Sequence, residues 1–264
     1  MTYANPSTSF RARKSLGQNF LMHARIAERI ALTAKLAPDA VVFEIGPGTG
    51  MLTAELLKLA GKVIALEADY ELFETLQTKF SSEIAHDRLE LVHGDIRTFD
   101  LTTLPKSYVL AANIPYYLTG EIFRMFLESK NQPSAMTLLV QKEVADRIVA
   151  RDGKESILSL SVKAYGTPKR EFTVPRGAFK PAPKVDSAVL TVRDISRKNF
   201  VNQKEEELFF KLLHAGFSHK RKFVRKNLLE VGLPSGNIPE KARAEDVSLT
   251  EWLAIISEKN RPSA

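Results

Sequence analysis

The sequence predicts a doubly wound α/β domain with a mostly parallel sheet, followed by a small helical domain. Five apolar runs are typical of strands, and segments with helical apolar spacing follow most of them. Near-continuous apolar strands that alternate with amphipathic helices indicate a parallel sheet covered on both faces. Beyond about residue 200 the pattern changes, and only helical segments follow.

The α/β domain is expected to begin with a covering helix at 24–36. Ile26, Ile30 and Ala34 are spaced four apart there and share one face. Crossovers between parallel strands are right-handed, so the following units wind onto both faces of the sheet. The predicted strands are 41–46, 62–69, 89–96, 107–113 and 135–141, and the predicted helices between and after them are 51–60, 70–80, 120–129 and 142–150.

The later segments are less regular. Residues 156–166 fit either a helix or a strand, whereas 169–175 and 185–194 resemble strands. Between these two strands the prolines of RGAFKPAPKV predict an extended loop. Helices are expected at 204–217, 220–232 and 248–258, which divides the chain into a basic arm (1–14), an α/β domain (15–196) and a helical lobe (197–264).

Composition limits the possible functions. The chain has 264 residues with 38 Lys plus Arg against 31 Asp plus Glu, and this excess of +7 favours a polyanionic partner such as nucleic acid. The absence of Cys excludes disulfides, thiolate zinc sites and cysteine nucleophiles, and the five His have no metal-ligand spacing, so no metal is expected. No apolar run is long enough to span a membrane, and the basic N-terminus lacks the apolar core of a secretory signal. We therefore expect a cytoplasmic protein, acting as a monomer.

A glycine-rich turn, EIGPGTG, follows the first strand. Gly46 and Gly48 allow the backbone to approach a ligand closely, and the turn opens a helix whose N-terminus favours anionic groups. The spacing does not match the dinucleotide pattern GxGxxG, because Met51 and Thr53 occupy the positions that would need glycine. By itself the turn is only a weak sign of a nucleotide-like ligand.

Polar residues end the next three strands. Glu67 lies 21 residues after Gly46, where a carboxylate can accept hydrogen bonds from both ribose hydroxyls, although a solvated strand-end acid is the alternative. Asp95 can accept from an adenine amino group, and Asn113 ends the fourth strand. S-adenosylmethionine fits this set, with its amino-acid tail near the glycine turn. Asn19 could hold the tail's carboxylate, or it could be an ordinary loop or cap residue.

The motif NIPY at 113–116 has the groups needed to activate an adenine amine. The side-chain carbonyl of Asn113 and the backbone carbonyl of Ile114 or Pro115 can accept the two N–H hydrogens, which favours a pyramidal amine with its lone pair aimed at a methyl donor. Rate enhancement would then come from positioning and preorganised dipoles. Pro115 stiffens the turn and contributes no competing N–H.

A base extruded into such a pocket is commonly held between aromatic faces. Tyr116 is predicted to provide one face. Phe179, in GAFKPAPK, is our candidate for the other, although a loop aromatic that fills the core is an equal alternative. Tyr117 is expected simply to pack.

In order along the chain, the motifs SLGQNFL, EIGPGTGMLT, ALEAD, GDI, NIPYYLTG, QKEVADRI and FKPAPKVDSAVL resemble those of the ribosomal RNA adenine N6-dimethyltransferases. The likeness runs from Ser15 to Val192 and is greatest to the small-subunit (KsgA) branch. It implies a Rossmann-like class I methyltransferase sheet and dimethylation of two adjacent adenosines in the hairpin near the 3′ end of small-subunit (16S) rRNA. It also implies a role late in small-subunit assembly.

The resemblance also implies roles for particular residues. The catalytic turn falls on Asn113 to Tyr116. Tyr117 and Leu118 depart from the Asn and Ile that commonly follow in the family, which leaves the pocket wall beyond Tyr116 open to question. The cofactor contacts fall on Gln18, Asn19, Leu21, Gly46, Glu67, Asp95 and Asn113.

Basic residues of the helical lobe are candidates for RNA binding. In KRKFVRKNLL, Arg221 and Arg225 are four apart, as are Lys222 and Lys226, so a helix there would present one basic face. Such a face can contact phosphates without reading sequence, although a solvated charged face is the alternative. Arg147, nearer the predicted pocket, and the arm residues Arg11, Arg13 and Lys14 are further candidates.

Three rival interpretations remain. An NAD-dependent oxidoreductase would need GxGxxG and a hydride-transfer residue, and the sequence has neither. A non-catalytic RNA-binding assembly or transcription factor could have lost Asn113 or Glu67, yet both are present. A large-subunit methyltransferase of the macrolide-resistance type can also carry NIPY, but FKPAPKVDSAVL and the basic lobe favour the small-subunit branch.

Overall fold

The computed structural model describes residues 17–259, so the predicted arm at 1–14 and its basic residues lie outside the described part. A seven-stranded sheet forms the centre of the molecule in the order β4-β3-β2-β5-β6-β9-β7. Its strands are β2 (Val41–Ile45), β3 (Lys62–Glu67), β4 (Leu89–His93), β5 (Val109–Asn113), β6 (Ala135–Gln141), β7 (Thr167–Val174) and β9 (Ser187–Arg193).

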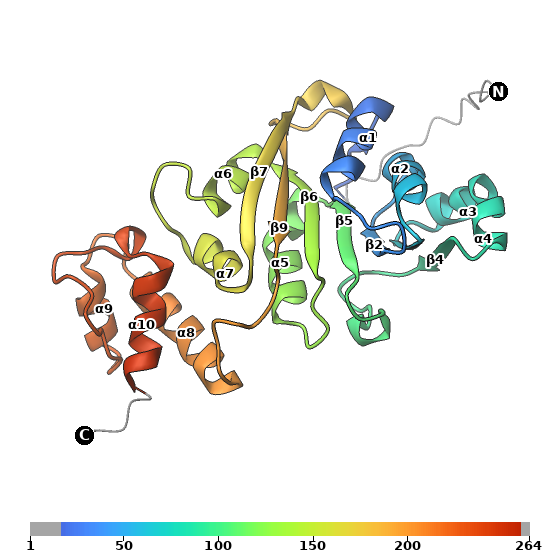
Figure 1. Ribbon diagram of the computed structural model, residues 1–264. Coiled ribbons are helices and arrows are strands. Elements are labelled where there is room, and N and C mark those ends of the chain that lie inside the picture. The colour runs from blue at the N-terminus through green and yellow to red at the C-terminus, as the bar shows by residue number, and fades with distance from the viewer. Residues whose placement is uncertain (1–16, 260–264) are drawn as a thin grey trace.

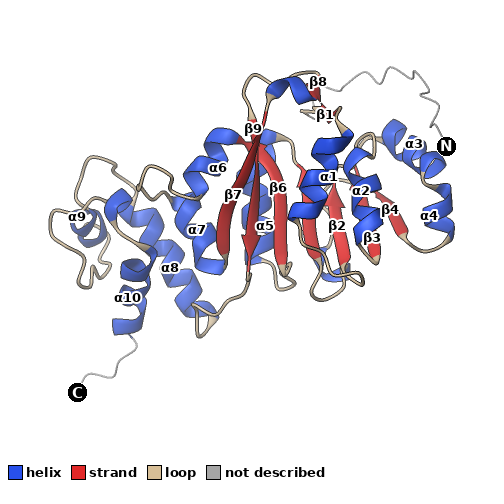
Figure 2. Ribbon diagram, turned by 45° about the horizontal axis from the view of Figure 1, so that its top comes forward, coloured by secondary structure: helices blue, strands red, loops and turns tan. Residues whose placement is uncertain are grey.

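Strands β4, β3, β2, β5 and β6 pair in parallel, and β9 runs antiparallel between β6 and β7. The parallel strands β2, β3, β5 and β6 are mostly buried on both faces because helices cover both sides of the sheet (Figure 2), whereas the edge strand β4 is partly exposed. The predicted mostly parallel, doubly wound sheet is therefore confirmed. The helices are α1 (Ala24–Thr33), α2 (Met51–Leu59), α3 (Tyr70–Lys79), α4 (Ser81–Ala85), α5 (Thr119–Glu128), α6 (Lys142–Ile148), α7 (Ile157–Tyr165), α8 (Gln203–Gly216), α9 (Val224–Leu229) and α10 (Leu249–Lys259).

Two apolar cores lie on the two faces of the sheet. On one face, Val42 and Ala111 pack against Ile30 of α1 and Leu56 of α2. On the other face, the apolar side chains of the sheet pack against α5 and α7, and the same core continues into the lobe formed by α8, α9 and α10. Figure 1 shows this lobe at one end of the molecule, next to α7. Trp252 of α10 is fully buried and stacks on Phe217 within the lobe. Tyr165 of α7 stacks on Phe210 of α8, which joins the lobe to the α/β domain.

The ambiguous segment 156–166 is helical. Ser156 caps α7 by accepting a hydrogen bond from the backbone N–H of Ser159, and the Ser159 side chain accepts in return from the Ser156 N–H. This capping box stabilises the start of the helix. It therefore favours a helix in a segment whose sequence pattern fits either a helix or a strand. The predicted extended loop at 176–185 is correct in outline, but it also contains β8 (Phe179–Lys180), which pairs with β1 (Phe20–Leu21).

The helix predicted at 220–232 forms, but it is shorter than predicted, because α9 covers only Val224–Leu229. Phe223 is extended, with φ −67° and ψ 140°, and the N–H of Val224 donates to the carbonyl of Ala242 at 2.9 Å. The buried side chain of Asn227 donates to the carbonyl of Gly216 at 2.6 Å. These tertiary hydrogen bonds hold residues 218–223 in a turn, so Arg221 and Lys222 precede the helix and the predicted single basic face does not form.

Candidate cofactor and catalytic site

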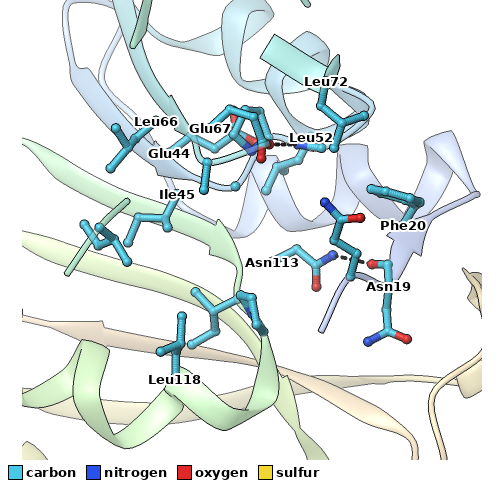
Figure 3. A pocket seen from close by; sticks show the side chains of 18 of the residues that line it. Asn19, Phe20, Glu44, Ile45, Leu52, Leu66, Glu67, Leu72, Asn113 and Leu118 are labelled. Carbon is cyan, nitrogen blue, oxygen red and sulfur yellow. Dashed lines mark hydrogen bonds between the residues drawn. The ribbon is translucent and has the colours of Figure 1, made fainter. Parts of the chain in front are cut away.

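A cavity opens at the edge of the sheet where the parallel strands end. Its walls come from the N-terminal segment, the glycine turn after β2, and the ends of β3, β4 and β5 (Figure 3). Carboxyl ends of parallel strands meet at one edge, and ligands of open α/β sheets bind there. Of the residues predicted to bind the cofactor or act in catalysis, all line this cavity: Gln18, Asn19, Leu21, Gly46, Gly48, Glu67, Asp95, Asn113, Ile114, Pro115 and Tyr116.

The glycine turn has a left-handed backbone at its glycines. Gly46 has φ +64°, and a Cβ built on it would meet no atom within 4 Å, so this glycine faces open space. Gly50 has φ +73° and caps α2, and a Cβ there would lie 2.5 Å from the Phe80 ring. The turn thus needs glycine for its conformation at both positions, and for close packing at Gly50.

Glu67 is fixed by two backbone donors. It is only 4% exposed and accepts hydrogen bonds from the N–H groups of Gly48 and Asp69, each at 2.9 Å. Burial raises the pKa of Glu67, while these two hydrogen bonds oppose the rise. Because a carboxylate has about four acceptor sites, two remain for further donors such as a pair of hydroxyls. The contact with Gly48 also links the end of β3 to the glycine turn.

Asp95 lies in a different setting from the one predicted. Its carboxylate accepts from the Arg97 guanidinium, with Nε 3.1 Å from Oδ1 and Nη2 2.5 Å from Oδ2, and from the Arg97 backbone N–H at 2.9 Å. Arg97 therefore holds the pKa of Asp95 below its usual range. Sequence reasoning missed Arg97, which also lines the cavity. Arg97 therefore orients the Asp95 carboxylate, which the sequence predicts to accept a hydrogen bond from an adenine amino group.

The N-terminal segment closes one side of the cavity. Gln18 Nε2 donates to Asp69 Oδ2 at 3.1 Å, and Asn19 Nδ2 donates to the carbonyl of Gly17 at 3.1 Å. Leu21 is buried and pairs with Phe179 across the short β1–β8 sheet. The pairing explains how a segment remote in sequence reaches the strand ends.

The NIPY motif forms a compact turn after β5. The Asn113 Nδ2 group donates to the backbone carbonyl of Asn19 at 3.0 Å (Figure 3). Residues Tyr116–Leu118 form one 3₁₀ turn, in which Leu118 N–H donates to the carbonyl of Pro115. The Tyr116 hydroxyl lies 2.6 Å from Ser187 Oγ, and burial raises the pKa of Tyr116. The turn is therefore attached to β1 on one side and β9 on the other.

The two remaining aromatic predictions need correction. Phe179 is 4% exposed, packs in the α1–α2 core and does not line the cavity, because its strand pairing with Leu21 directs it inward. This is the core-filling alternative, and stacking on a base would require the ring to become exposed. Tyr117, expected to pack, is 58% exposed and lines the cavity mouth beside Gly17.

Glu44 is a further cavity residue that sequence reasoning missed. It lies within β2 among apolar residues, and its side chain is 1% exposed. Its Oε2 atom has no hydrogen-bond partner among the described residues. Burial raises the pKa of Glu44 to about 8, the charge of Glu67 adds to the rise, and the neighbouring Thr53 and Lys79 oppose it. Lys79 in turn donates to the carbonyl of Thr49 in the glycine turn at 2.7 Å.

The predicted RNA-binding residues do not reach this cavity. Arg147 on α6 pairs with Glu143 at 3.0 Å, and Lys222 pairs with Glu230 at 2.7 Å. Arg225 is half-buried, with Nε 3.3 Å from Ser235 Oγ. Within residues 17–259 there is no cluster of His, Asp and Glu suited to a metal ion, and no helix there has the length and apolarity to cross a membrane.

Comparison with known proteins agrees with this geometry. The family model described as ribosomal RNA adenine dimethylase matches residues 9–261. Two curated relatives are both named ribosomal RNA small subunit methyltransferase A. The one from Dehalococcoides mccartyi is 39% identical over 95% of this chain and 89% of its own length, and the one from Fusobacterium nucleatum is 36% identical over 94% and 97%.

Two solved structures share the fold. The 23S rRNA methyltransferase ErmE superimposes with a TM-score of 0.75 at 29% identity, over 90% of this chain and 98% of its own. A dimethyladenosine transferase from Plasmodium falciparum does so with a TM-score of 0.78 at 25% identity, over 92% and 98%. These likenesses confirm the predicted class of sheet. The chain belongs to the ribosomal RNA adenine dimethylase family.

Proposed function

We propose that this protein is an S-adenosylmethionine-dependent rRNA (adenine-N6,N6)-dimethyltransferase. Its proposed target is the pair of adjacent adenosines in the hairpin near the 3′ end of small-subunit rRNA, modified late in subunit assembly. The observation that carries the proposal is that Glu67 and Asn113 end β3 and β5, Asp95 follows the end of β4, and all three line one cavity. Family membership and the names of the curated relatives support the reaction and the substrate class.

The residues present fit S-adenosylmethionine. Glu67 has acceptor sites left for ribose hydroxyls, Asp95 is oriented by Arg97, and the left-handed Gly46 leaves room for a close approach. The buried Oε2 atom of Glu44 has no hydrogen-bond partner among the described residues, and an unsatisfied buried polar atom is costly. The ammonium group of S-adenosylmethionine is a donor that could satisfy it. Bound there, the cofactor supplies the activated methyl group.

The catalytic turn can hold a target amine without a general base. Asn113 directs its Nδ2 to Asn19, which leaves its Oδ1 as an acceptor for one amine hydrogen. A backbone carbonyl at Ile114 or Pro115 accepts the other. These dipoles are fixed before the base arrives, so little reorganisation is needed. The ring of Tyr116, held by Ser187, provides a stacking face.

The proposal is tested by mapping the methylated nucleotides. The protein is incubated with S-adenosylmethionine carrying a labelled methyl group and with small-subunit particles that lack the modification. We expect label on two adjacent adenosines near the 3′ end of the small-subunit RNA, and none with the Asn113→Ala variant. Large-subunit particles are the matched control, since label there would favour the activity named for ErmE. Label on a base other than adenine would refute the proposal.

A further inference from the structure

A groove separate from the cavity lies on the same edge of the sheet, beside the catalytic turn. Its volume is about 530 Å³, and it is lined by the start of α6 and by the loop segments that flank β7 and β9: Lys142, Glu143, Asp146, Arg176, Lys184, Val185 and Asp186. Strands β6 and β7 end at this edge, and the antiparallel β9 begins there. Three elements distant in sequence therefore bring Lys142, Arg176 and Lys184 to one place.

The three basic side chains of this groove are available to a ligand. Lys142, Arg176 and Lys184 are exposed, and no ion pair joins any of them to an acid within residues 17–259. The acids that line the groove are already engaged. Glu143 pairs with Arg147 and Asp146 with Arg170 and Arg151, while Asp186 accepts the backbone N–H of Arg176 at 2.9 Å. The groove is thus a cationic surface whose acids are largely neutralised.

The groove is connected to the catalytic turn by two neighbouring residues. Ser187, which binds the Tyr116 hydroxyl, directly follows Asp186 of the groove wall. The Asp186 carbonyl also accepts the backbone N–H of Lys142, at 3.0 Å. A chain segment whose base enters the cavity beside Tyr116 can continue along this edge. The groove is therefore placed to meet the phosphates next to that base.

We propose that Lys142, Arg176 and Lys184 form the groove that holds the RNA backbone beside the target adenosine. This inference rests on the proposed function and adds a contact surface distinct from the lobe residues Arg221 and Lys222. Arg176 can bind a phosphate in a bidentate manner, and the two lysines act as point charges. Such contacts position a nucleic acid without reading its sequence.

The test compares two triple variants of the full chain with equal loss of charge. The first replaces Lys142, Arg176 and Lys184 with Ala. The control replaces the exposed Lys106, Lys130 and Lys198, which lie in loops at the opposite edge of the sheet. Affinity for a naked hairpin RNA is measured at several salt concentrations, together with affinity for small-subunit particles that lack the modification, S-adenosylmethionine affinity and methyl transfer to those particles.

We expect the groove variant to bind RNA at least 10-fold more weakly. The slope of log affinity against log salt concentration should be smaller in magnitude by about 2, because each lost phosphate contact reduces that slope by about 0.7–0.9. Cofactor affinity should not change, and the control should stay within about 2-fold of the parent protein. Equal losses in both variants would overturn the inference, since only net charge would matter. Unchanged hairpin binding with weaker particle binding would also overturn it and would indicate an acidic protein partner. Failure of the parent protein to methylate adenine would instead refute the proposed function.

Discussion

The side-chain amide of Asn113 donates a hydrogen bond to the backbone carbonyl of Asn19, 94 residues earlier in the chain, at 3.0 Å. This contact joins the catalytic turn to the N-terminal segment and fixes which end of the amide faces outward. In the proposed mechanism Asn113 therefore has two roles: its nitrogen holds the turn to the N-terminal segment, and its oxygen accepts from the substrate. The two roles can be separated by substitution.

Asn113→Ala should abolish methyl transfer and leave cofactor binding within a few-fold of the parent. Loss of one preorganised polar group typically lowers turnover by about 10²–10³. Single-turnover transfer and calorimetric titration with S-adenosylmethionine measure the two effects. Asn113→Asp is the matched control, because it keeps an acceptor but loses the donor to Asn19, so it should be intermediate. Full activity in the Ala variant would remove Asn113 from the mechanism.

Glu67→Gln should weaken cofactor binding by roughly 10–100-fold, because hydrogen bonds to a charged acceptor contribute about 1.5–3 kcal/mol. The amide keeps the shape of the side chain, but its NH2 group replaces one of the two oxygens that accept from the Gly48 and Asp69 N–H groups, so one of these hydrogen bonds is lost. Glu90→Gln, on an exposed strand residue, is the control. Equal cofactor affinity in the two variants would mean that the ribose lies elsewhere.

Glu44→Gln should stabilise the fold more at high pH than at low pH. Burial raises the folded-state pKa of Glu44 from its ordinary 4.5 to about 8, so between these values the folded state binds more protons than the unfolded state. The parent protein therefore loses stability from this group as pH rises from 4.5 to about 8. Thermal unfolding of both proteins at pH 5 and pH 8.5 measures the effect. If the difference in melting temperature between the two proteins did not grow with pH, the folded-state pKa of Glu44 would not be raised, and the prediction would be wrong.

Tyr116→Phe should retain most activity, whereas Tyr116→Ala should lose it. The Phe variant keeps the ring and loses only the hydroxyl contact with Ser187. Stacking of a base on an aromatic ring is worth about 1–3 kcal/mol, so the Ala variant should raise KM for RNA by roughly 10–100-fold. Steady-state kinetics with the hairpin substrate distinguish the two. If the Phe variant were as inactive as the Ala variant, the hydroxyl would be the important group.

Arg221→Ala and Arg225→Ala should behave differently, although the sequence suggested one basic face. Arg221 is exposed in the turn before α9, so its loss should weaken RNA binding and lower the salt slope by about 0.7–0.9 without affecting stability. Arg225 is half-buried against Ser235, so its loss should also cost about 1 kcal/mol of unfolding free energy. Thermal unfolding and salt-dependent RNA titration separate these effects. Identical behaviour of the two variants would restore the single-face interpretation.

Most of the sheet and the cavity edge could be predicted because they depend on local signals. Apolar runs indicate the parallel strands. Glu67 and Asn113 stand at the ends of β3 and β5, and Asp95 lies just beyond the end of β4. The errors concern residues whose position depends on distant partners. Phe179 is buried because of its pairing with Leu21, and α9 starts late because Val224 binds Ala242.

Glu44 was missed for a related reason. A single acid in an apolar strand carries no periodic signal, and only the folded protein places it against the cavity.

The lobe and the α/β domain share one apolar core that runs from the sheet through α7 to Trp252. A hinge between the two would have to open this core, so the separation between Arg221 and the NIPY turn is set by the fold. The protein therefore presents these two surfaces at one fixed distance. An RNA that contacts both Arg221 and the NIPY turn must have a curvature that matches this distance. The protein would therefore select a hairpin by its shape before any base enters the cavity.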